Sequence, residues 1–346
     1  MLYGAFAVIV IVLLAVDLLV VHRKTHAVSI KEAATWSAIW IGVSILFGLF
    51  IAQFHETTTP GGNTTAEFFT GYVIEKSLSV DNVFLFVLIF NALSVPKELQ
   101  HRVLFYGVLG AIVMRTILIF TGAALIERFE WVLYVFGAFL LYVAWRTWRA
   151  RDEHPDVNQS PLLKRIRRVL PTTDGYRGEH FLVREPVGAT GATPARQRSK
   201  TRLMATPLLV VLVLVEFTDL IFAVDSIPAI FAVTRDPFIV LTSNIFAILG
   251  LRALYFLLAG FADRLRYLKA GLAIILGYVG VKLLTENIEG IYHPTPLQSL
   301  SVISTVLVVV VVASLRAGPT DEPVSAAGVG PPWSTSGEGA SDDSER

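Results

Sequence analysis

The sequence predicts an all-α fold, that of a polytopic membrane protein with about nine transmembrane helices. Three observations lead to this prediction. Hydrophobic residues make up 54% of the 346 residues and charged residues only 16%, with a mean hydropathy of +0.62, which is too apolar for a soluble domain of this length. Several long apolar windows follow one another along the chain. An acidic motif inside one of these windows recurs in another, 144 positions later.

Each window is about long enough to cross a bilayer, since a spanning helix needs roughly 20 mostly apolar residues. The first window lacks the basic start and the small-residue cleavage site of a signal peptide, so we expect it to remain as a membrane helix. The nine windows are residues 2–21, 33–53, 70–94, 103–125, 130–149, 205–232, 239–260, 267–288 and 298–315.

The distribution of Lys and Arg among the predicted loops predicts the orientation, because basic residues in short loops stay in the cytoplasm. With the N-terminus outside, the thirteen basic residues from Arg146 to Arg202 lie inside, whereas the outer loops hold only Arg128 and Arg235. We therefore expect a multi-pass protein of the cytoplasmic membrane, with its N-terminus outside and its C-terminus in the cytoplasm.

Two polar segments divide the chain. Residues 150–204 form a basic connector with no apolar run long enough to cross, so we expect a cytoplasmic loop that could dock a protein partner. Residues 317–346 are rich in Gly, Pro, Ser, Asp and Glu, which predicts a disordered cytoplasmic tail. The predicted division is two peripheral helices (1–53), a first repeat of helices three to five (66–149), the connector, a second repeat of helices six to eight (205–288), a ninth helix (298–316) and the tail.

The acidic motif belongs to a longer internal duplication. Arg115 in the fourth window matches Arg252 in the seventh, and Arg146 in the fifth matches Lys282 in the eighth, so windows three to five resemble windows six to eight. Because each copy has three helices and the connector does not cross, the second copy must be inverted. Inverted repeats with a site near the membrane midplane, built by interrupted helices, are typical of transporters. Pro228 could interrupt one such helix.

Five carboxylates lie inside the third and sixth windows. An ionised carboxylate costs about 2.5–3.5 kcal/mol at the centre of a membrane helix, so together they cost on the order of 10 kcal/mol, and a bound cation is the simplest compensation. On straight helices they would not all converge, so either the helices unwind locally or the carboxylates are successive stations on a path. The predicted metal ligands are Glu75, Asp81, Glu216, Asp219 and Asp225, with Asn82 and Ser226 beside them.

These oxygen ligands suit Mg²⁺, Ca²⁺ or Mn²⁺. The chain has no cysteine, and all seven histidines fall outside the apolar windows, so thiolate and imidazole ligands are not expected inside the membrane. We expect a divalent ion that is transported, not a tightly bound cofactor. Repulsion among neighbouring carboxylates disfavours the state in which all are charged, so a proton could replace the metal and the two fluxes could be coupled.

Other interpretations remain open at this point. Asp81 and Asp225 could form structural ion pairs with Arg115 or Arg252, and the same arginines could serve as counter-charges when no metal is bound. The hydroxyls of Ser77, Ser79 and Thr218 could simply bond a carbonyl one turn back. A membrane scaffold without transport activity is then the alternative function. Nucleic-acid binding is not expected, because no basic patch is interleaved with aromatics, and no catalytic or nucleotide-binding motif points to an enzyme.

At these motifs the chain resembles the TerC family, which includes the Alx-type manganese exporters. The resemblance is carried by residues 75–84 (EKSLSVDNVF), 216–229 (EFTDLIFAVDSIPA) and 244–252 (NIFAILGLR). It implies a bacterial-type protein of the cytoplasmic membrane that exports Mn²⁺, with the acidic residues of the two motifs lining the route.

The family name also implies a link to tellurium resistance, and some members are associated with envelope stress, metallation of secreted enzymes or membrane-protein assembly. Tellurite is an oxyanion, for which a path lined by carboxylates has the wrong charge. Any resistance effect would therefore be indirect.

Overall fold

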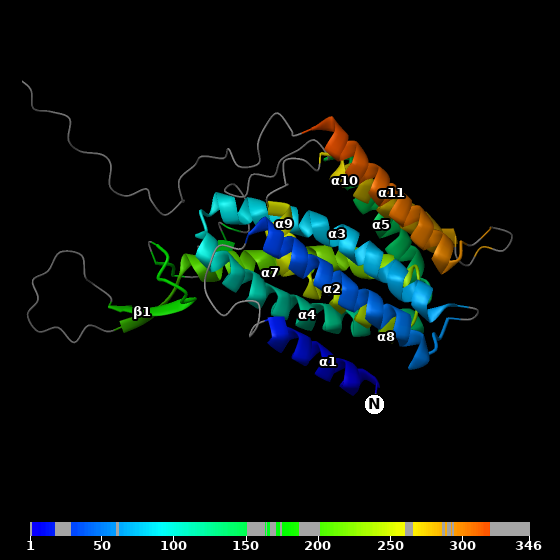
Figure 1. Cartoon of the computed structure of the whole chain (residues 1–346), viewed down its shortest axis with the longest axis horizontal. Coiled ribbons are helices and arrows are strands. Elements are labelled where there is room, and N and C mark those ends of the chain that lie inside the picture. The colour runs from blue at the N-terminus through cyan, green and yellow to red at the C-terminus, as the bar shows by residue number, and fades with distance from the viewer. Residues whose placement is uncertain are drawn as a thin grey trace, which may run out of the picture.

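The protein is a bundle of long, roughly aligned helices, seen from the side in Figure 1. This computed structural model describes residues 2–17, 29–59, 62–150, 163, 165–166, 171–173, 175–186, 201–259, 266–285, 288, 292 and 294–318. The elements are α1 (Leu2–Val16), α2 (Ile30–Phe50) with a 3-10 turn η2 (Ile51–Gln53), α3 (Thr64–Ala92), α4 (Lys97–Arg128), α5 (Val132–Arg149), β1 (Leu182–Pro186), β2 (Thr201–Ala205), α7 (Pro207–Phe231), α8 (Pro237–Leu249), α9 (Leu251–Ala259), α10 (Leu268–Thr285) and α11 (Pro296–Ala317).

The described helices confirm a multi-pass membrane protein. Five spans, α2 with η2, α4, α7, α10 and α11, are long and apolar enough to cross a membrane, and the bent pair of α8 and α9 makes a sixth if it is one span. Every predicted window contains a helix, but α1 covers only 15 residues and α3 carries Glu67, Glu75, Lys76 and Asp81. The number of nine spans therefore stays a prediction, as does the disordered tail, which from residue 319 lies outside the described residues.

Local sequence signals set where the helices begin. Ser29 accepts a hydrogen bond from the Glu32 amide at the start of α2, and Asn63 accepts one from the Ala66 amide at the start of α3. Thr295 and Gln298 form a reciprocal capping box at the start of α11. Proline occupies the first helical position of α7, α8 and α11, where its missing amide hydrogen costs nothing.

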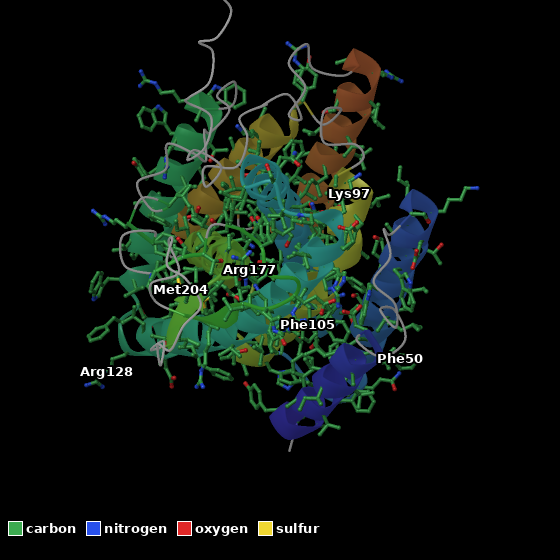
Figure 2. All side chains as sticks on the ribbon, turned by 90° about the vertical axis from the view of Figure 1, so that its left-hand side faces the viewer. Phe50, Lys97, Phe105, Arg128, Arg177 and Met204 are labelled. Atoms are coloured by element: carbon green, nitrogen blue, oxygen red, sulfur yellow. The ribbon has the colours of Figure 1, made fainter. Side chains whose placement is uncertain are left out.

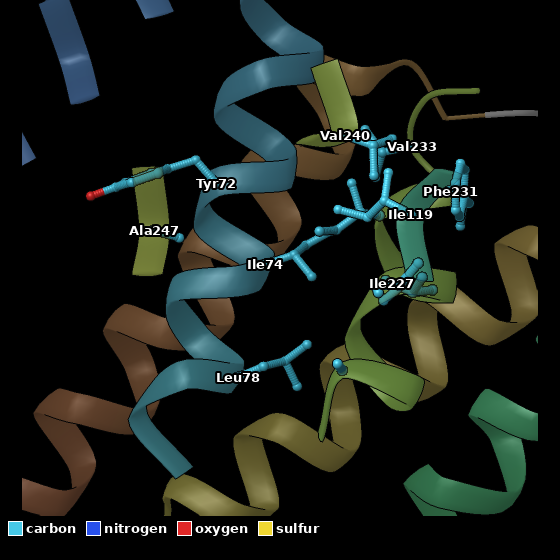
Figure 3. Close-up of a cluster of buried hydrophobic side chains, with 14 of the residues drawn as sticks. Tyr72, Ile74, Leu78, Ile119, Ile227, Phe231, Val233, Val240 and Ala247 are labelled. Atoms are coloured by element: carbon cyan, nitrogen blue, oxygen red, sulfur yellow. The ribbon is translucent and has the colours of Figure 1, made fainter. Parts of the chain in front are cut away.

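The centre of the bundle is formed by α3, α4, α7 and α8. α3 packs against α8 and α7, and α4 packs against the same two helices. Figure 3 shows one apolar part of this contact, where Ile74 of α3, Ile119 of α4 and Ile227 of α7 converge. All residues of α8 from Phe238 to Leu249 are buried, as expected of a helix that is apolar on every side. Its polar residues Thr242, Ser243 and Asn244 each donate a side-chain hydrogen bond.

The outermost helices differ in this respect. α1 buries only Phe6 and Val10, and α11 buries only four of its 22 residues. Both helices are apolar on their exposed faces, for example at Ile11 and Val308. In a membrane protein such faces contact lipid, which explains why neither helix has the polar outer face of a soluble helix.

The break in the helices occurs between α8 and α9, not at Pro228. α7 continues past Pro228 to Phe231, whereas α8 and α9 meet at Gly250 with a bend of 43°. Lys76 of α3 donates a hydrogen bond from Nζ to the Ala247 carbonyl, 3.2 Å away, at the end of α8. This ammonium satisfies one of the carbonyls that a helix end leaves without an intrahelical partner and suits its partial negative charge.

A short antiparallel hairpin of β1 and β2 lies at one end of the bundle, within the predicted connector (Figure 1). Figure 2 looks onto this end, where Arg177 and Met204 lie. Tyr176 donates a hydrogen bond to the Leu93 carbonyl at 2.8 Å, and Arg102 of α4 forms an ion pair with Glu179. Burial raises the pKa of the Tyr176 phenol, so it stays protonated and remains a donor. The described part of the connector is thus attached to the ends of α3 and α4.

The opposite end of the bundle is closed by the segment after α2. Asp236 caps α8 by accepting hydrogen bonds from the Phe238 and Ile239 amides. Its second oxygen accepts from His55 Nε2 at 2.8 Å and from the Thr58 amide at 3.0 Å. One carboxylate therefore holds a helix start and a loop together.

α5 and α10 lie close together at two glycines, Gly137 and Gly280. A Cβ on Gly280 would lie 3.1 Å from the Gly137 carbonyl oxygen, a backbone atom that cannot move unless the helices separate. We expect Gly280→Ala to lower the free energy of unfolding by about 1–3 kcal/mol, measured by thermal unfolding in detergent. Gly277→Ala on the same helix is the matched control, because its Cβ would come no closer than 3.9 Å to another residue. Equal stability of the two variants would contradict the prediction.

Candidate functional site

Arg115 of α4 is the centre of a buried polar cluster inside the bundle. Its side chain is only 1% exposed. Nε and Nη2 donate to the two oxygens of Asp219 on α7, at 3.2 and 3.0 Å, in the bidentate geometry that makes arginine–carboxylate pairs strong. Nη1 forms an ion pair with Glu75 of α3 and donates to Ser226 of α7 at 3.3 Å.

Three further side chains complete this Arg115 cluster. Asn244 of α8 donates from Nδ2 to Glu75 at 3.0 Å, Ser79 lies 3.5 Å from the same carboxylate, and Asn82 donates to Asp219 at 3.4 Å. The cluster is thus formed by Glu75, Ser79, Asn82, Arg115, Asp219, Ser226 and Asn244, which come from four helices. Four of the seven predicted ligands, Glu75, Asn82, Asp219 and Ser226, lie in it.

The cluster is not balanced in charge or in hydrogen bonds. Two carboxylates face one guanidinium, which leaves one formal negative charge uncompensated within the cluster. The side-chain oxygens of Asn82 and Asn244 are buried and have no hydrogen-bond partner. Buried polar atoms are usually paired. Two free amide oxygens beside two carboxylates therefore form an oxygen-rich donor set of the type that hard divalent cations prefer.

Asp81 and Asp225 lie outside the Arg115 cluster and share a small cavity. The cavity has a volume of about 40 Å³, room for on the order of two or three waters. Both carboxylates are half-buried, and the positive charges that act on them are Lys269 on Asp81 and Arg146 on Asp225. The cavity lies between α3, α5, α7 and α10 and is lined by Leu78, Asp81, Val143, Thr147, Phe222, Asp225, Leu272 and Leu276.

Glu216 occupies a third position, one turn before Asp219 on α7. Its carboxylate rests on Gly110 of α4, where any Cβ would collide with the carboxylate. The glycine therefore makes the space that this acidic side chain fills. The five predicted carboxylates thus do not converge on one point. Since α3 and α7 are continuous helices, neither shows the local unwinding that convergence would need.

Arg252 does not join the acidic residues of the two motifs in the part of the chain that the structure describes. It forms a buried ion pair with Asp17, the residue that follows α1, and its guanidinium lies over the Phe105 ring, 5.5 Å from the ring centroid. Asp17 was not among the predicted site residues, although an acidic residue inside the first apolar window was a signal. Arg252 is a structural link between the end of α1 and α9. Arg115 is a counter-charge, but to Glu75 and Asp219 and not to Asp81 or Asp225 as the sequence analysis allowed.

The hydroxyls outside the cluster bond backbone. Ser77 donates to the Val73 carbonyl, and Thr218 donates to the Leu214 carbonyl at 2.7 Å. Both bonds run one turn back along the helix, which is the simpler of the two interpretations. Among the described residues, no group of three or more His, Cys, Asp or Glu side chains could hold a metal ion. Any ion bound here would be held by carboxylates in pairs, together with amide, hydroxyl and water oxygens.

Comparison with known proteins places these residues in a family. Residues 61–321 match the model of the integral membrane protein TerC family. The chain is 49% identical over 319 residues to the protein Alx of Salmonella typhi, covering 90% of this chain and 93% of that protein. It is 50% identical over 313 residues to Alx of Escherichia coli K12, covering 89% and 92%. The description of both relatives proposes a membrane-bound redox modulator.

A further relative is an uncharacterized membrane protein of Myxococcus xanthus, 46% identical over 324 residues, covering 93% of this chain and 95% of that protein. No solved structure matches the chain. The family match covers most of the chain and includes every residue of the Arg115 cluster and of the Asp81–Asp225 cavity. The chain therefore belongs to the TerC family of integral membrane proteins.

Proposed function

We propose that this protein is a membrane transporter that exports a divalent cation, Mn²⁺ foremost, along a route lined by the carboxylates of α3 and α7. The observation that carries the proposal is that both helices contribute two acidic residues, in equivalent positions of their motifs, to the interior of the bundle. Glu75 and Asp219 meet at Arg115, and Asp81 and Asp225 meet at the cavity. Intramembrane charges on this scale are retained for a function.

We further infer that the two motifs belong to inverted repeats. Glu75 and Ser226 are joined through Arg115 at one end of the contact between α3 and α7, and Asn82 and Asp219 are joined at the other. In the duplicated motifs, Glu75 is equivalent to Asp219 and Asn82 is equivalent to Ser226. The pair of Glu75 with Ser226 therefore corresponds to the pair of Asp219 with Asn82. The contact of α3 with α8 likewise corresponds to that of α7 with α4. Such symmetry supports a site at the repeat interface, as in many transporters.

The donor chemistry supports a hard divalent ion. Carboxylate, amide and water oxygens bind Mn²⁺ and Ca²⁺, and the chain has no cysteine to favour a softer metal. The resemblance to manganese exporters favours Mn²⁺ over Ca²⁺. If this chain also shares the redox role that the name of its relatives proposes, the effect would pass through the metal, because a chain without cysteine has no thiol to oxidise.

The test is transport in inside-out vesicles from cells that lack their own exporters. We expect vesicles with this protein to accumulate Mn²⁺ faster than control vesicles, and Ca²⁺ more slowly than Mn²⁺. If the ion exchanges with protons, an acidic vesicle lumen will accelerate accumulation, and dissipating the pH gradient will remove the acceleration. A rate that does not depend on the gradient would exclude proton coupling. If neither ion moves, the transport proposal fails and the scaffold alternative takes its place.

A further inference from the structure

We propose that the Arg115 guanidinium is the resident cation of the metal-free transporter, and that it makes the route selective for divalent over monovalent cations. The inference rests on the proposed function and makes Arg115 the residue that discriminates divalent from monovalent cations. Arg115 comes from α4, whereas its two carboxylates come from α3 and α7. Three helices therefore meet at a single positive charge.

The guanidinium fills the position that a shared metal ion would need. Nε and Nη2 hold both oxygens of Asp219, while Nη1 binds Glu75. All three nitrogens are used, and the whole side chain is 1% exposed. A cation that binds Glu75 and Asp219 together must first displace Arg115, because both cannot occupy the space between the two carboxylates.

The arginine leaves part of the donor set unused. Asn82 and Asn244 are 1% and 0% exposed, and their amide nitrogens already bind Asp219 and Glu75. The amide oxygens of Asn82 and Asn244 have no hydrogen-bond partner. Each oxygen belongs to the same amide group as the nitrogen that binds the carboxylate, so it lies close to that carboxylate. The guanidinium binds the carboxylates through a rigid fork of donor hydrogens. A metal ion in the same place could be coordinated by the two amide oxygens as well as by the carboxylates.

Charge decides which ions can make this exchange. A monovalent ion would replace one positive charge by another and would lose the hydrogen bonds that the arginine makes. A divalent ion brings a second charge to two carboxylates and can use the amide oxygens as well. The tethered guanidinium thus acts as a competitor that Na⁺ or K⁺ does not displace and that Mn²⁺ does.

The experiment compares Arg115→Gln with Arg252→Gln, each of which removes one buried arginine. Both variants and the wild type are purified in lipid nanodiscs, and thermal unfolding is followed with MnCl₂, NaCl or choline chloride at equal ionic strength. We expect both variants to unfold at lower temperature than the wild type in choline chloride. Mn²⁺ should restore the unfolding temperature of Arg115→Gln and not that of Arg252→Gln, because the former leaves two facing carboxylates that a divalent ion can bridge, whereas the latter leaves the single carboxylate of Asp17.

Binding of Mn²⁺ gives the second measurement. Arg115→Gln should bind Mn²⁺ about tenfold or more tightly than the wild type in choline chloride, since no arginine has to be displaced. Replacing choline by Na⁺ should weaken binding to the variant and leave the wild type unchanged. If Arg115→Gln does not fold, Arg115→Lys replaces it. The lysine keeps the charge but not the fork, so Mn²⁺ should bind a few times more tightly than in the wild type.

The outcomes separate this inference from the proposed function. If Mn²⁺ stabilises Arg115→Gln no more than Arg252→Gln, or if Na⁺ does not compete in the variant, Arg115 is a structural ion pair and the inference is wrong. The same holds if Arg115→Lys folds and binds Mn²⁺ as the wild type does. If the wild type neither binds nor transports Mn²⁺ or Ca²⁺, the proposed function fails, whatever the variants show.

Discussion

Asp81→Asn and Asp225→Asn are each expected to reduce Mn²⁺ efflux by about a hundredfold or more, which corresponds to about 2.7 kcal/mol. Both carboxylates face the cavity between α3, α5, α7 and α10, where the amide of Asn fits but brings no charge. Neither residue belongs to the Arg115 cluster, so neutralising it leaves no buried arginine unpaired. The variants should therefore reach the membrane at wild-type levels, and vesicle uptake at matched protein amounts measures the loss.

Asp81→Glu is the control for this prediction, because it keeps the charge and lengthens the side chain. We expect it to retain a measurable part of the efflux, in proportion to how well the cavity accepts one more methylene group. Loss of abundance in Asp81→Asn and Asp225→Asn, with unchanged transport per molecule, would instead favour a structural role for these acids. That result would support the scaffold alternative over transport.

Arg252→Met is expected to lower the free energy of unfolding by about 3–5 kcal/mol, because it removes one half of a buried ion pair and keeps the buried carboxylate of Asp17. The pair is buried on both sides and connects α1 to α9. The effect should appear as lower membrane abundance and a lower unfolding temperature. Transport per folded molecule should change little, since the pair lies outside the Arg115 cluster and the cavity.

The double variant Asp17→Leu/Arg252→Met tests this explanation. Replacing both charges by apolar side chains leaves no buried carboxylate behind, so the double variant should recover most of the stability that Arg252→Met loses. A double variant as unstable as the sum of the two single changes would mean that Asp17 and Arg252 act independently. The stability would then come from other contacts, such as that of Arg252 with the Phe105 ring.

The helical class and the position of the helices could be predicted from the sequence, because spanning helices are apolar on most sides and leave long windows. The ends of the helices were less accurate where caps lie outside the apolar run, as with Asn63 before α3. The break at Gly250 was missed because proline is the stronger signal for a break. The hairpin was missed because its strands are five residues long and carry Arg184 and Arg202.

The residue types of the site could be predicted, but their grouping could not. Glu75 and Asp81 are six residues apart on one helix, and spacing alone does not say which neighbouring helix each side chain meets. The structure separates them, since α4 brings Arg115 to Glu75 while α5 and α10 enclose Asp81. The pairing of Arg252 with Asp17 depends on a contact between α9 and the end of α1, which no local pattern contains.

Asp236 links a buried helix to a loop at the surface. Its carboxylate caps α8 and also binds the loop at His55 and Thr58. Because the Thr58 amide is bonded to the same side chain as the first amides of α8, a tilt of that helix must be transmitted to the loop. Thr58 itself is exposed, and the chain contains no cysteine. One introduced thiol at this position would therefore be a unique attachment point for a spectroscopic probe that follows the movement of a fully enclosed helix.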